Sequence, residues 1–168
     1  MNNNELNNNV LDVLAGELVE ELKTGKYYIA TAESCTGGMI ASSIVNISGA
    51  SYVMNESYIT YSNEAKERIL GVNHETLEKY GAVSAETAKE MVCGVAKTAG
   101  ADCAIAVTGI AGPDGGTEEK PVGTVYVGLY LNGNVEIKRY NFEGNRYEVR
   151  FKTTRNVISD MLRIIRKN

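Results

Sequence analysis

Apolar side chains recur along the chain with distinct spacings, and these spacings predict its helices and strands. Over Val10–Leu22 they recur every three or four residues, which is the spacing of an amphipathic helix. The continuous apolar run Cys103–Val107 is typical of a strand buried on both faces. Two further runs, Thr124–Leu131 and Val135–Phe142, flank Asn132-Gly133, which is a strong hairpin signal. The other expected helices lie over 38–47, 63–70, 76–80, 84–99 and 146–165, and the other expected strands over 27–30 and 52–60.

The expected helices and strands are interleaved along the chain. This order predicts an α/β protein, a three-layer α/β/α sandwich with a mixed, mainly parallel sheet that ends in a hairpin. A chain of 168 residues suits one domain over residues 1–168. Asn occupies six of the first nine positions, so we expect residues 1–9 to be disordered.

Composition and charge exclude several classes of function. The net charge of −4 argues against broad binding to nucleic acid. No apolar run is long enough to span a bilayer, so we expect no membrane partner. Residues 1–5 lack the basic start of a signal peptide, which predicts a cytoplasmic location. Three scattered cysteines and one histidine offer no metal-binding pattern, so no metal site is expected.

A turn rich in reactive side chains follows the first expected strand. Thr31-Ala32-Glu33-Ser34-Cys35-Thr36-Gly37-Gly38 places hydroxyls, a thiol, a carboxylate and two glycines just before a helical pattern. Such a turn puts a side chain at the C-terminal edge of the sheet, beside the N–H groups that begin the helix. The glycines let the backbone approach a ligand closely. The turn therefore predicts a nucleophile, a phosphate site, or both.

Ser34 needs an activating group to act as a nucleophile. His74 lies in a polar turn–helix segment, so a Ser–His–Asp triad is hard to build and a lysine base is the alternative. Lys66, early in a helix that follows a strand, is the best-placed lysine, and burial would have to keep it neutral. Tyr61 ends that strand and is expected to bond the lysine or relay a proton. On spacing alone, a solvated helix lysine paired with a neighbouring glutamate is the commoner reading.

Two neighbours of Ser34 leave alternatives open. Cys35 is a rival nucleophile, although a small buried cysteine is the commoner role. Glu33 either orients the site or bonds the N–H groups of the helix.

A long irregular segment, 108–123, follows the buried strand and contains both prolines and five glycines. Loops of this length in a compact domain are usually functional. Arg146 and Arg150 share a face at the start of the last helix and suit a phosphate or carboxylate clamp. The alternative is a solvated basic face. The chain has neither a P-loop nor a dinucleotide-binding fingerprint. The glycines after Ser34 and in 108–123 therefore belong to a different kind of site.

Five blocks in order along the chain resemble the nicotinamide-nucleotide amidase family. This family is the C-terminal domain of the competence/damage-inducible protein CinA, which is also found alone. The resemblance covers about residues 10 to 165, and its specificity comes from the order of the blocks. The blocks are Thr31–Gly38, Thr60–Lys66, Tyr80–Ser84, Val107–Gly116 and Glu119–Val125. One segment outside these blocks, Gly49-Ala50-Ser51, departs from the family pattern, because members often have Gly-Ser-Ser at this place.

The resemblance implies an amidase that converts nicotinamide mononucleotide and water to nicotinic acid mononucleotide and ammonia, within pyridine nucleotide recycling. It assigns catalysis to Ser34, Lys66 and Tyr61, without a metal or an organic cofactor. Arg146 and the glycine loop would bind the 5′-phosphate. The expected substrate-binding residues are Glu33, Thr36, Gly37, Gly38, Thr108, Gly109, Gly112 and Arg146.

A rival function belongs to a different class: a non-catalytic module of the same fold that binds a nucleotide or a partner protein. Loss of Ser34, Lys66 or Tyr61 would have favoured it, and all three are present. Only an enzyme releases ammonia from nicotinamide mononucleotide. The expected partner is a small nucleotide, and the sequence leaves open whether the domain forms a homo-oligomer.

Overall fold

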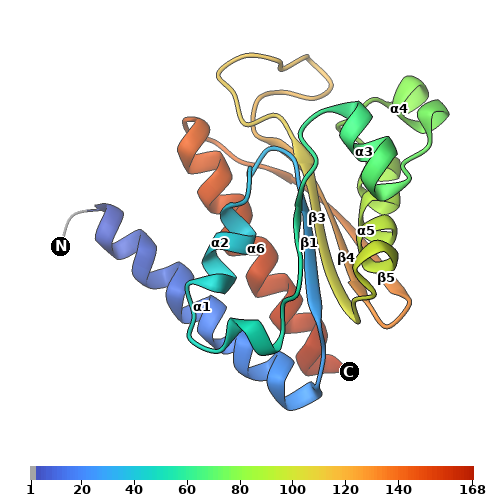
Figure 1. The fold of residues 1–168 in the computed structure, drawn as a ribbon. Helices are drawn as coiled ribbons and strands as arrows, with labels where there is room; N and C mark the ends of the chain where they lie inside the picture. The colour runs from blue at the N-terminus through green and yellow to red at the C-terminus, as the bar shows by residue number, and fades with distance from the viewer. Residues whose placement is uncertain (1–2) are drawn as a thin grey trace.

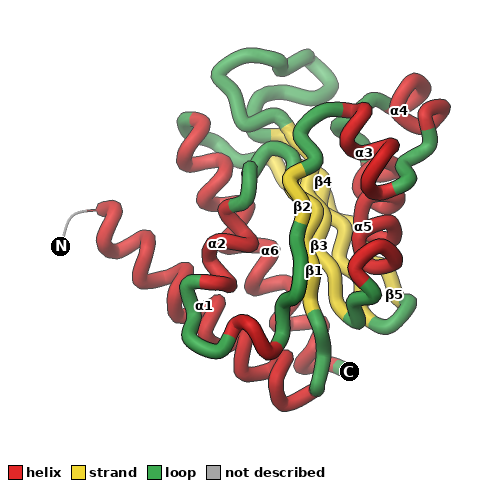
Figure 2. The backbone as a smooth tube through the Cα atoms, in the orientation of Figure 1, coloured by secondary structure: helices red, strands yellow, loops and turns green. Residues whose placement is uncertain are grey.

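The computed structural model describes residues 3–168, in which five strands form one mixed sheet between two layers of helices (Figures 1 and 2). The strands are β1 (Ile29–Glu33), β2 (Tyr58–Ile59), β3 (Cys103–Gly109), β4 (Thr124–Leu131) and β5 (Asn134–Asn141). The helices are α1 (Asn3–Gly25), α2 (Met39–Val45), α3 (Asn63–Leu70), α4 (His74–Tyr80), α5 (Ala85–Ala99) and α6 (Arg146–Lys167), with a short 3₁₀ helix at Ala50–Tyr52. The predicted α/β/α class is confirmed. No helix in the described part of the chain is both long and apolar enough to cross a membrane.

The strand order is β2-β1-β3-β4-β5, and the order brings three carboxyl ends to one edge. β1 runs parallel to β2 and β3, whereas β4 pairs antiparallel with β3 and with β5, its partner in the predicted hairpin. The sheet is therefore mixed as predicted, but it is not mainly parallel, because the hairpin strands form the longer pairings. Glu33 pairs with Ile59 on β2 and with Val107 on β3. The residues that come next on the three strands therefore lie side by side at this edge, and Ser34 is the central one.

The two faces of the sheet carry side chains of different size. Helices α1, α2 and α6 cover one face and α3, α4 and α5 the other (Figure 1). The first face is lined by large aliphatic side chains, among them Ile29, Ile105, Val127 and Leu129. The second face carries small residues, Ala30, Ala32, Ala104, Ala106 and Gly128. Small residues let α5 approach closely, and a Cβ at Gly128 would lie 2.7 Å from the Ala88 carbonyl oxygen.

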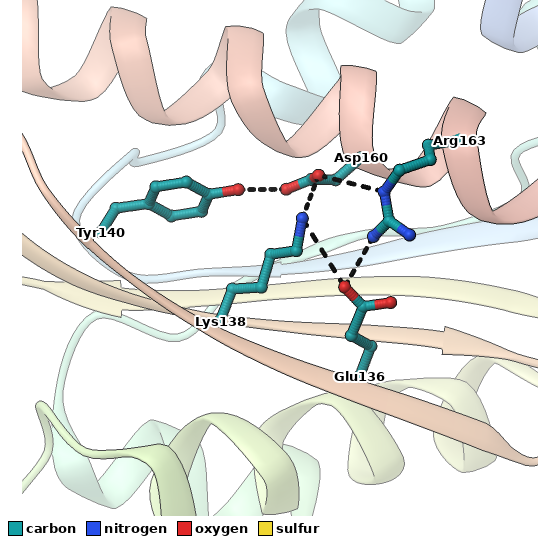
Figure 3. Close-up of polar contacts among 5 residues, drawn as sticks. All are labelled: Glu136, Lys138, Tyr140, Asp160 and Arg163. Atoms are coloured by element: carbon teal, nitrogen blue, oxygen red, sulfur yellow. Dashed lines mark hydrogen bonds and ion pairs between the residues drawn. The ribbon is translucent and has the colours of Figure 1, made fainter.

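Helix α6 is fastened to β5 by a polar network (Figure 3). Asp160 on α6 accepts hydrogen bonds from Lys138 and from the Tyr140 hydroxyl on β5. Arg163 Nη2 donates to Glu136 Oε1 at 2.6 Å. Burial and the bond to Asp160 raise the pKa of the Tyr140 phenol, so it remains a donor. The network orients the helix that begins at Arg146.

Two segments differ from the pattern-based expectation. Residues 1–9 are expected to be disordered, but α1 begins at Asn3, because helix propagates cheaply from the amphipathic segment behind it. Met1 and Asn2 lie outside the described residues. The strand expected over 52–60 is limited to Tyr58–Ile59. Just before β2, the Thr31 N–H of β1 donates to the Ser57 hydroxyl. This side-chain acceptor takes the place of the backbone carbonyl that a longer β2 would offer to β1.

Two glycines inside helices predict opposite effects of the same substitution. A Cβ at Gly94 on α5 would lie 2.0 Å from the Leu70 carbonyl oxygen of α3, whereas one at Gly16 on α1 would meet no atom within 4 Å. Gly94→Ala should lower the free energy of unfolding by about 1–3 kcal/mol through overpacking. Gly16→Ala should raise it by about 0.5–1 kcal/mol, because alanine favours the helix. Urea unfolding measures both, and a stabilised Gly94→Ala would contradict the close helix contact.

Candidate active site

Ser34 lies in a tight turn between β1 and α2. Its N–H donates to the Val107 carbonyl oxygen of β3 (3.1 Å), and its own carbonyl accepts from the Gly37 N–H (3.1 Å). Gly37 and Gly38 adopt φ angles of 59° and 93°, in the left-handed region that glycine tolerates best. The turn therefore reverses the chain immediately after the strand, at the sheet edge.

Glu33 shapes this turn from the inside. Its side chain is fully buried, and its carboxylate accepts hydrogen bonds from the N–H groups of Gly38 (2.9 Å), Ile40 (3.1 Å) and Ala41 (2.8 Å). An anion at the N-terminus of a helix satisfies otherwise unpaired N–H groups and complements the helix dipole. The expectation that Glu33 binds substrate is therefore corrected: its oxygens are used by α2, so it positions the turn.

Lys66 approaches Ser34 from α3. The lysine is only 1% exposed, and its Nζ lies 3.3 Å from Ser34 Oγ. The same nitrogen donates to the carbonyl oxygens of Thr60 (3.0 Å), Tyr61 (3.2 Å) and Ser62 (3.4 Å). Ser62 also caps α3, because its hydroxyl accepts from the Ala65 N–H. The predicted Ser34–Lys66 proximity is thus found, and the solvated-lysine alternative does not hold.

Burial lowers the pKa of Lys66, because its charged form is poorly hydrated in the interior. The three carbonyl oxygens act in the opposite sense by stabilising an ammonium group. A neutral amine has two N–H donors for carbonyl oxygens and one lone pair. That lone pair is available to the Ser34 hydroxyl, the arrangement that a general base requires.

Cys35, the rival nucleophile, lies beside Ser34. Burial raises the pKa of its thiol to about 12. The thiol is therefore protonated at neutral pH, and a thiol is a far weaker nucleophile than a thiolate. The environment favours Ser34 over Cys35 as the reacting group.

A cavity of about 210 Å³ opens over this pair. Its lining includes six of the residues that the sequence singled out, namely Ser34, Tyr61, Lys66, Thr108, Gly109 and Arg146. It also includes Cys35 and three small apolar residues, Ala82, Val83 and Ala111. Five expected binding residues are not part of the lining, namely Glu33, Thr36, Gly37, Gly38 and Gly112. Ala82 and Val83 were not predicted as site residues, because small apolar side chains do not indicate a function. Their place in the block Tyr80–Ser84 was the one feature of the sequence that pointed to them.

The mouth of the cavity is formed by Arg146 and Tyr61. Arg146 Nη1 donates to the Gly112 carbonyl oxygen (2.7 Å), and Nη2 donates to the Tyr61 hydroxyl (3.0 Å). The Tyr61 side chain is exposed. The expected contact between Tyr61 and Lys66 therefore runs through the tyrosine's carbonyl, while its hydroxyl points to the arginine.

Thr108 holds the opposite wall. Its hydroxyl donates to the Ala82 carbonyl oxygen at 2.7 Å, which fixes the segment between α4 and α5 over the end of β3. Gly81, in the same segment, accepts hydrogen bonds from the hydroxyls of Ser84 and Thr87 at the start of α5. The apolar wall is therefore rigidly placed.

Several helices begin at this edge of the sheet, and their dipoles favour a negatively charged ligand. α3 contains Lys66 in its first turn, α5 follows the Ala82–Val83 wall, and α6 begins with Arg146 (Figure 1), whereas the first N–H groups of α2 are already bonded to the Glu33 carboxylate. Helix N-termini carry partial positive charge, to which the Arg146 guanidinium adds. The site combines a buried serine–lysine pair with a cationic mouth.

Fold and site together define a three-layer α/β domain with a Ser–Lys pair at the carboxyl edge of its parallel strands. Residues 11–165 match the family model described as the CinA C-terminal domain, so the chain belongs to this family.

Relatives and solved structures agree with this family. The chain is 54% identical over 157 residues to a putative competence-damage inducible protein of Clostridium beijerinckii, covering 94% of this chain and 37% of the relative. A CinA-like protein of Kosmotoga olearia is 59% identical over 128 residues, covering 76% of this chain and 31% of the relative. The chain thus spans about a third of the length of these relatives.

Two crystal structures share the whole fold. A CinA-superfamily protein of Klebsiella pneumoniae superposes with a TM-score of 0.91 at 32% identity, covering 94% of this chain and 99% of that one. The competence/damage inducible protein CihA of Agrobacterium tumefaciens gives 0.90 at 40% identity, covering 94% and 96%.

The lowered pKa of Lys66 predicts a specific dependence of stability on pH. Between the folded-state pKa and the unfolded value of about 10.4, the unfolded chain binds more protons, so the free energy of unfolding rises with pH. Relative to Lys66→Met, the wild type should therefore gain stability as pH rises towards about 9.5, by at most about 1.4 kcal/mol per unit. Urea unfolding across this range measures the difference.

Lys89, an exposed lysine on α5, provides the matched control. The difference between the wild type and Lys89→Met serves as the baseline against which the pH dependence of the Lys66→Met difference is compared. A difference between the wild type and Lys66→Met that varies with pH no more than this baseline would mean that Lys66 titrates as an ordinary lysine.

Proposed function

We propose that this domain is an amidase that hydrolyses nicotinamide mononucleotide to nicotinic acid mononucleotide and ammonia. The observation that carries the proposal is the fully buried Lys66 amine 3.3 Å from the Ser34 hydroxyl, inside a cavity with an arginine at its mouth. A lysine is costly to bury without a function that needs it neutral. The substrate itself comes from the resemblance to nicotinamide-nucleotide amidases.

In the proposed reaction, Ser34 Oγ attacks the carboxamide carbon while neutral Lys66 takes the serine proton. The resulting ammonium returns this proton to the departing ammonia, which leaves an acyl group on Ser34. Water then attacks the ester with Lys66 again as the base, and releases the acid. A pyridinium ring bound in the cavity is positively charged, so it would further disfavour the ammonium form of Lys66.

The tetrahedral intermediate requires hydrogen-bond donors for its oxyanion. Within the turn, the Gly37 N–H is used by the Ser34 carbonyl and the Gly38 N–H by Glu33. The N–H groups of Cys35 and Thr36 have no acceptor among the described residues, and they follow the nucleophile directly. We assign the oxyanion site to them.

The remaining parts of the substrate match the cavity in kind. Its small wall of Ala82, Val83 and Ala111 suits a flat ring, and the ribose 5′-phosphate would extend past Tyr61 to Arg146. Arg146 brings a guanidinium to the cavity lining, and a phosphate would take the place of the Tyr61 hydroxyl or the Gly112 carbonyl as its hydrogen-bond partner. The helix N-termini at this edge add to the attraction.

The second candidate function is a non-catalytic nucleotide-binding or partner-binding module. The cationic mouth would serve such a module equally well, but the buried amine beside a serine would have no purpose in it. Incubating the protein with nicotinamide mononucleotide and measuring ammonia separates the two functions. Binding without ammonia release would favour the module and would overturn the amidase proposal.

The nucleophile assignment predicts contrasting effects at adjacent positions. Ser34→Ala should abolish ammonia release, because no acyl-enzyme can form, and it should leave the thermal unfolding midpoint nearly unchanged. Cys35→Ala should retain most of the activity, because the buried thiol is not ionised. An inactive Cys35→Ala together with an active Ser34→Ala would reverse the assignment.

The phosphate assignment predicts a loss that depends on the substrate. Removing a charge-assisted hydrogen bond costs about 1.5–3 kcal/mol, or about tenfold to hundredfold in kcat/KM. Arg146→Ala should lower kcat/KM for the mononucleotide by that factor and scarcely affect nicotinamide riboside, which has no phosphate. Equal losses on both substrates would show that Arg146 acts on the chemistry or on the Tyr61 contact.

A further inference from the structure

Arg150 reaches from α6 to the nucleophile turn. Its Nε and Nη2 both donate to the Thr36 carbonyl oxygen, at 3.1 and 2.7 Å. The turn is thereby bound on two sides: Glu33 accepts from the N–H groups at its end, and Arg150 donates to the carbonyl in its middle. Ser34 and Cys35 lie between β1 and this pair of charged contacts.

We propose that Arg150 is a positioning residue that sets the reactivity of Ser34 by fixing the peptide plane after Thr36. It does not touch the substrate. The proposal rests on the Ser34–Lys66 chemistry proposed above, and it assigns to Arg150 a role different from the phosphate contact of Arg146.

The turn needs such a contact because its own backbone is permissive. Gly37 and Gly38, with φ of 59° and 93°, have no Cβ to restrict them, so the turn after Thr36 relies on hydrogen bonds for its shape. Two of these bonds are neutral: the Thr36 carbonyl accepts from the Met39 N–H at 3.3 Å, and the Gly37 N–H donates to the Ser34 carbonyl at 3.1 Å. A shift of the Thr36 carbonyl would displace Thr36 itself, whose N–H is one of the two groups assigned to the oxyanion. A guanidinium that donates two N–H bonds to one carbonyl oxygen opposes this shift, because a charge-assisted bond is about twice as strong as a neutral one.

The placement of Arg150 argues against a direct role in binding. The arginine is absent from the cavity lining, in contrast to Arg146 one helical turn earlier. Its guanidinium is directed at the Thr36 carbonyl oxygen, behind the lining residues Ser34 and Cys35. The two arginines of the expected clamp therefore point to different targets, one to the cavity mouth and the other to the turn.

The test compares Arg150→Met and Arg150→Lys with the wild type in two assays. The first is steady-state ammonia release from nicotinamide mononucleotide. The second is the rate at which a fluorophosphonate labels Ser34, in which an O–P bond forms, the P–F bond breaks, and the proton passes to Lys66. Labelling needs the nucleophile and its base but no phosphate site, so it reports on the turn alone. Arg155→Met is the matched control, because Arg155 is exposed on the same helix and donates a hydrogen bond to its neighbour Asn156.

Arg150→Met should lower kcat about tenfold to hundredfold, with KM changed less than about threefold, and should slow labelling by a similar factor. Arg150→Lys keeps the positive charge but cannot donate from two nitrogens to the Thr36 carbonyl oxygen. Its rates in both assays should therefore lie between those of the wild type and Arg150→Met. Arg155→Met should match the wild type. Arg150→Lys also retains the aliphatic stem, so it decides the question if Arg150→Met does not fold.

Several results would overturn the proposal. Wild-type rates of labelling and turnover in a folded Arg150→Lys and Arg150→Met would show that the turn holds itself. A loss confined to KM would make Arg150 a substrate-binding residue. If the wild type releases no ammonia but Ser34 is still labelled, the amidase proposal fails while the labelling rates decide the role of Arg150. A wild type that does not react at all would contradict both.

Discussion

The contact between a buried amine and the Ser34 hydroxyl is the interaction on which the account of this protein depends. Lys66 is sealed from solvent and surrounded by oxygens, three of them backbone carbonyls and the fourth that of Ser34. Burial lowers the pKa of Lys66 and so favours the neutral amine, the form that can accept a proton. Burying a lysine amine costs free energy, and the amidase proposal gives this amine a chemical role that accounts for the cost.

The rest of the domain holds the two groups in place. Parallel pairing of β1 with β2 and β3 aligns the strand ends from which Ser34 and the α3 segment emerge. Small residues on one face of the sheet allow α5, and α3 against it, to approach closely. On the other face, the network around Asp160 fastens α6, which delivers arginines to the cavity mouth and to the turn.

Much of this could be read from the sequence, and the exceptions have physical causes. Helix spacing and the Asn132-Gly133 turn each act within a few residues, so they predicted their elements well. Glu33 was ambiguous, because a carboxylate beside a helix start serves either the helix or a ligand, and only burial decides. The targets of Arg146 and Arg150 depend on contacts between residues far apart in the sequence, which spacing cannot reveal. The length of the edge strand β2 was predicted wrongly, because the Thr31 N–H of β1 donates to the Ser57 hydroxyl and not to a backbone carbonyl of the neighbouring segment.

The most direct measurement is to locate the acyl group during turnover. The enzyme is mixed with nicotinamide mononucleotide, quenched rapidly with acid, digested, and the peptide that contains Ser34 and Cys35 is sequenced by fragmentation mass spectrometry. The account predicts a nicotinoyl-nucleotide ester on the Ser34 oxygen. An acyl group on Cys35, or steady ammonia release with no acylated Ser34, would contradict it.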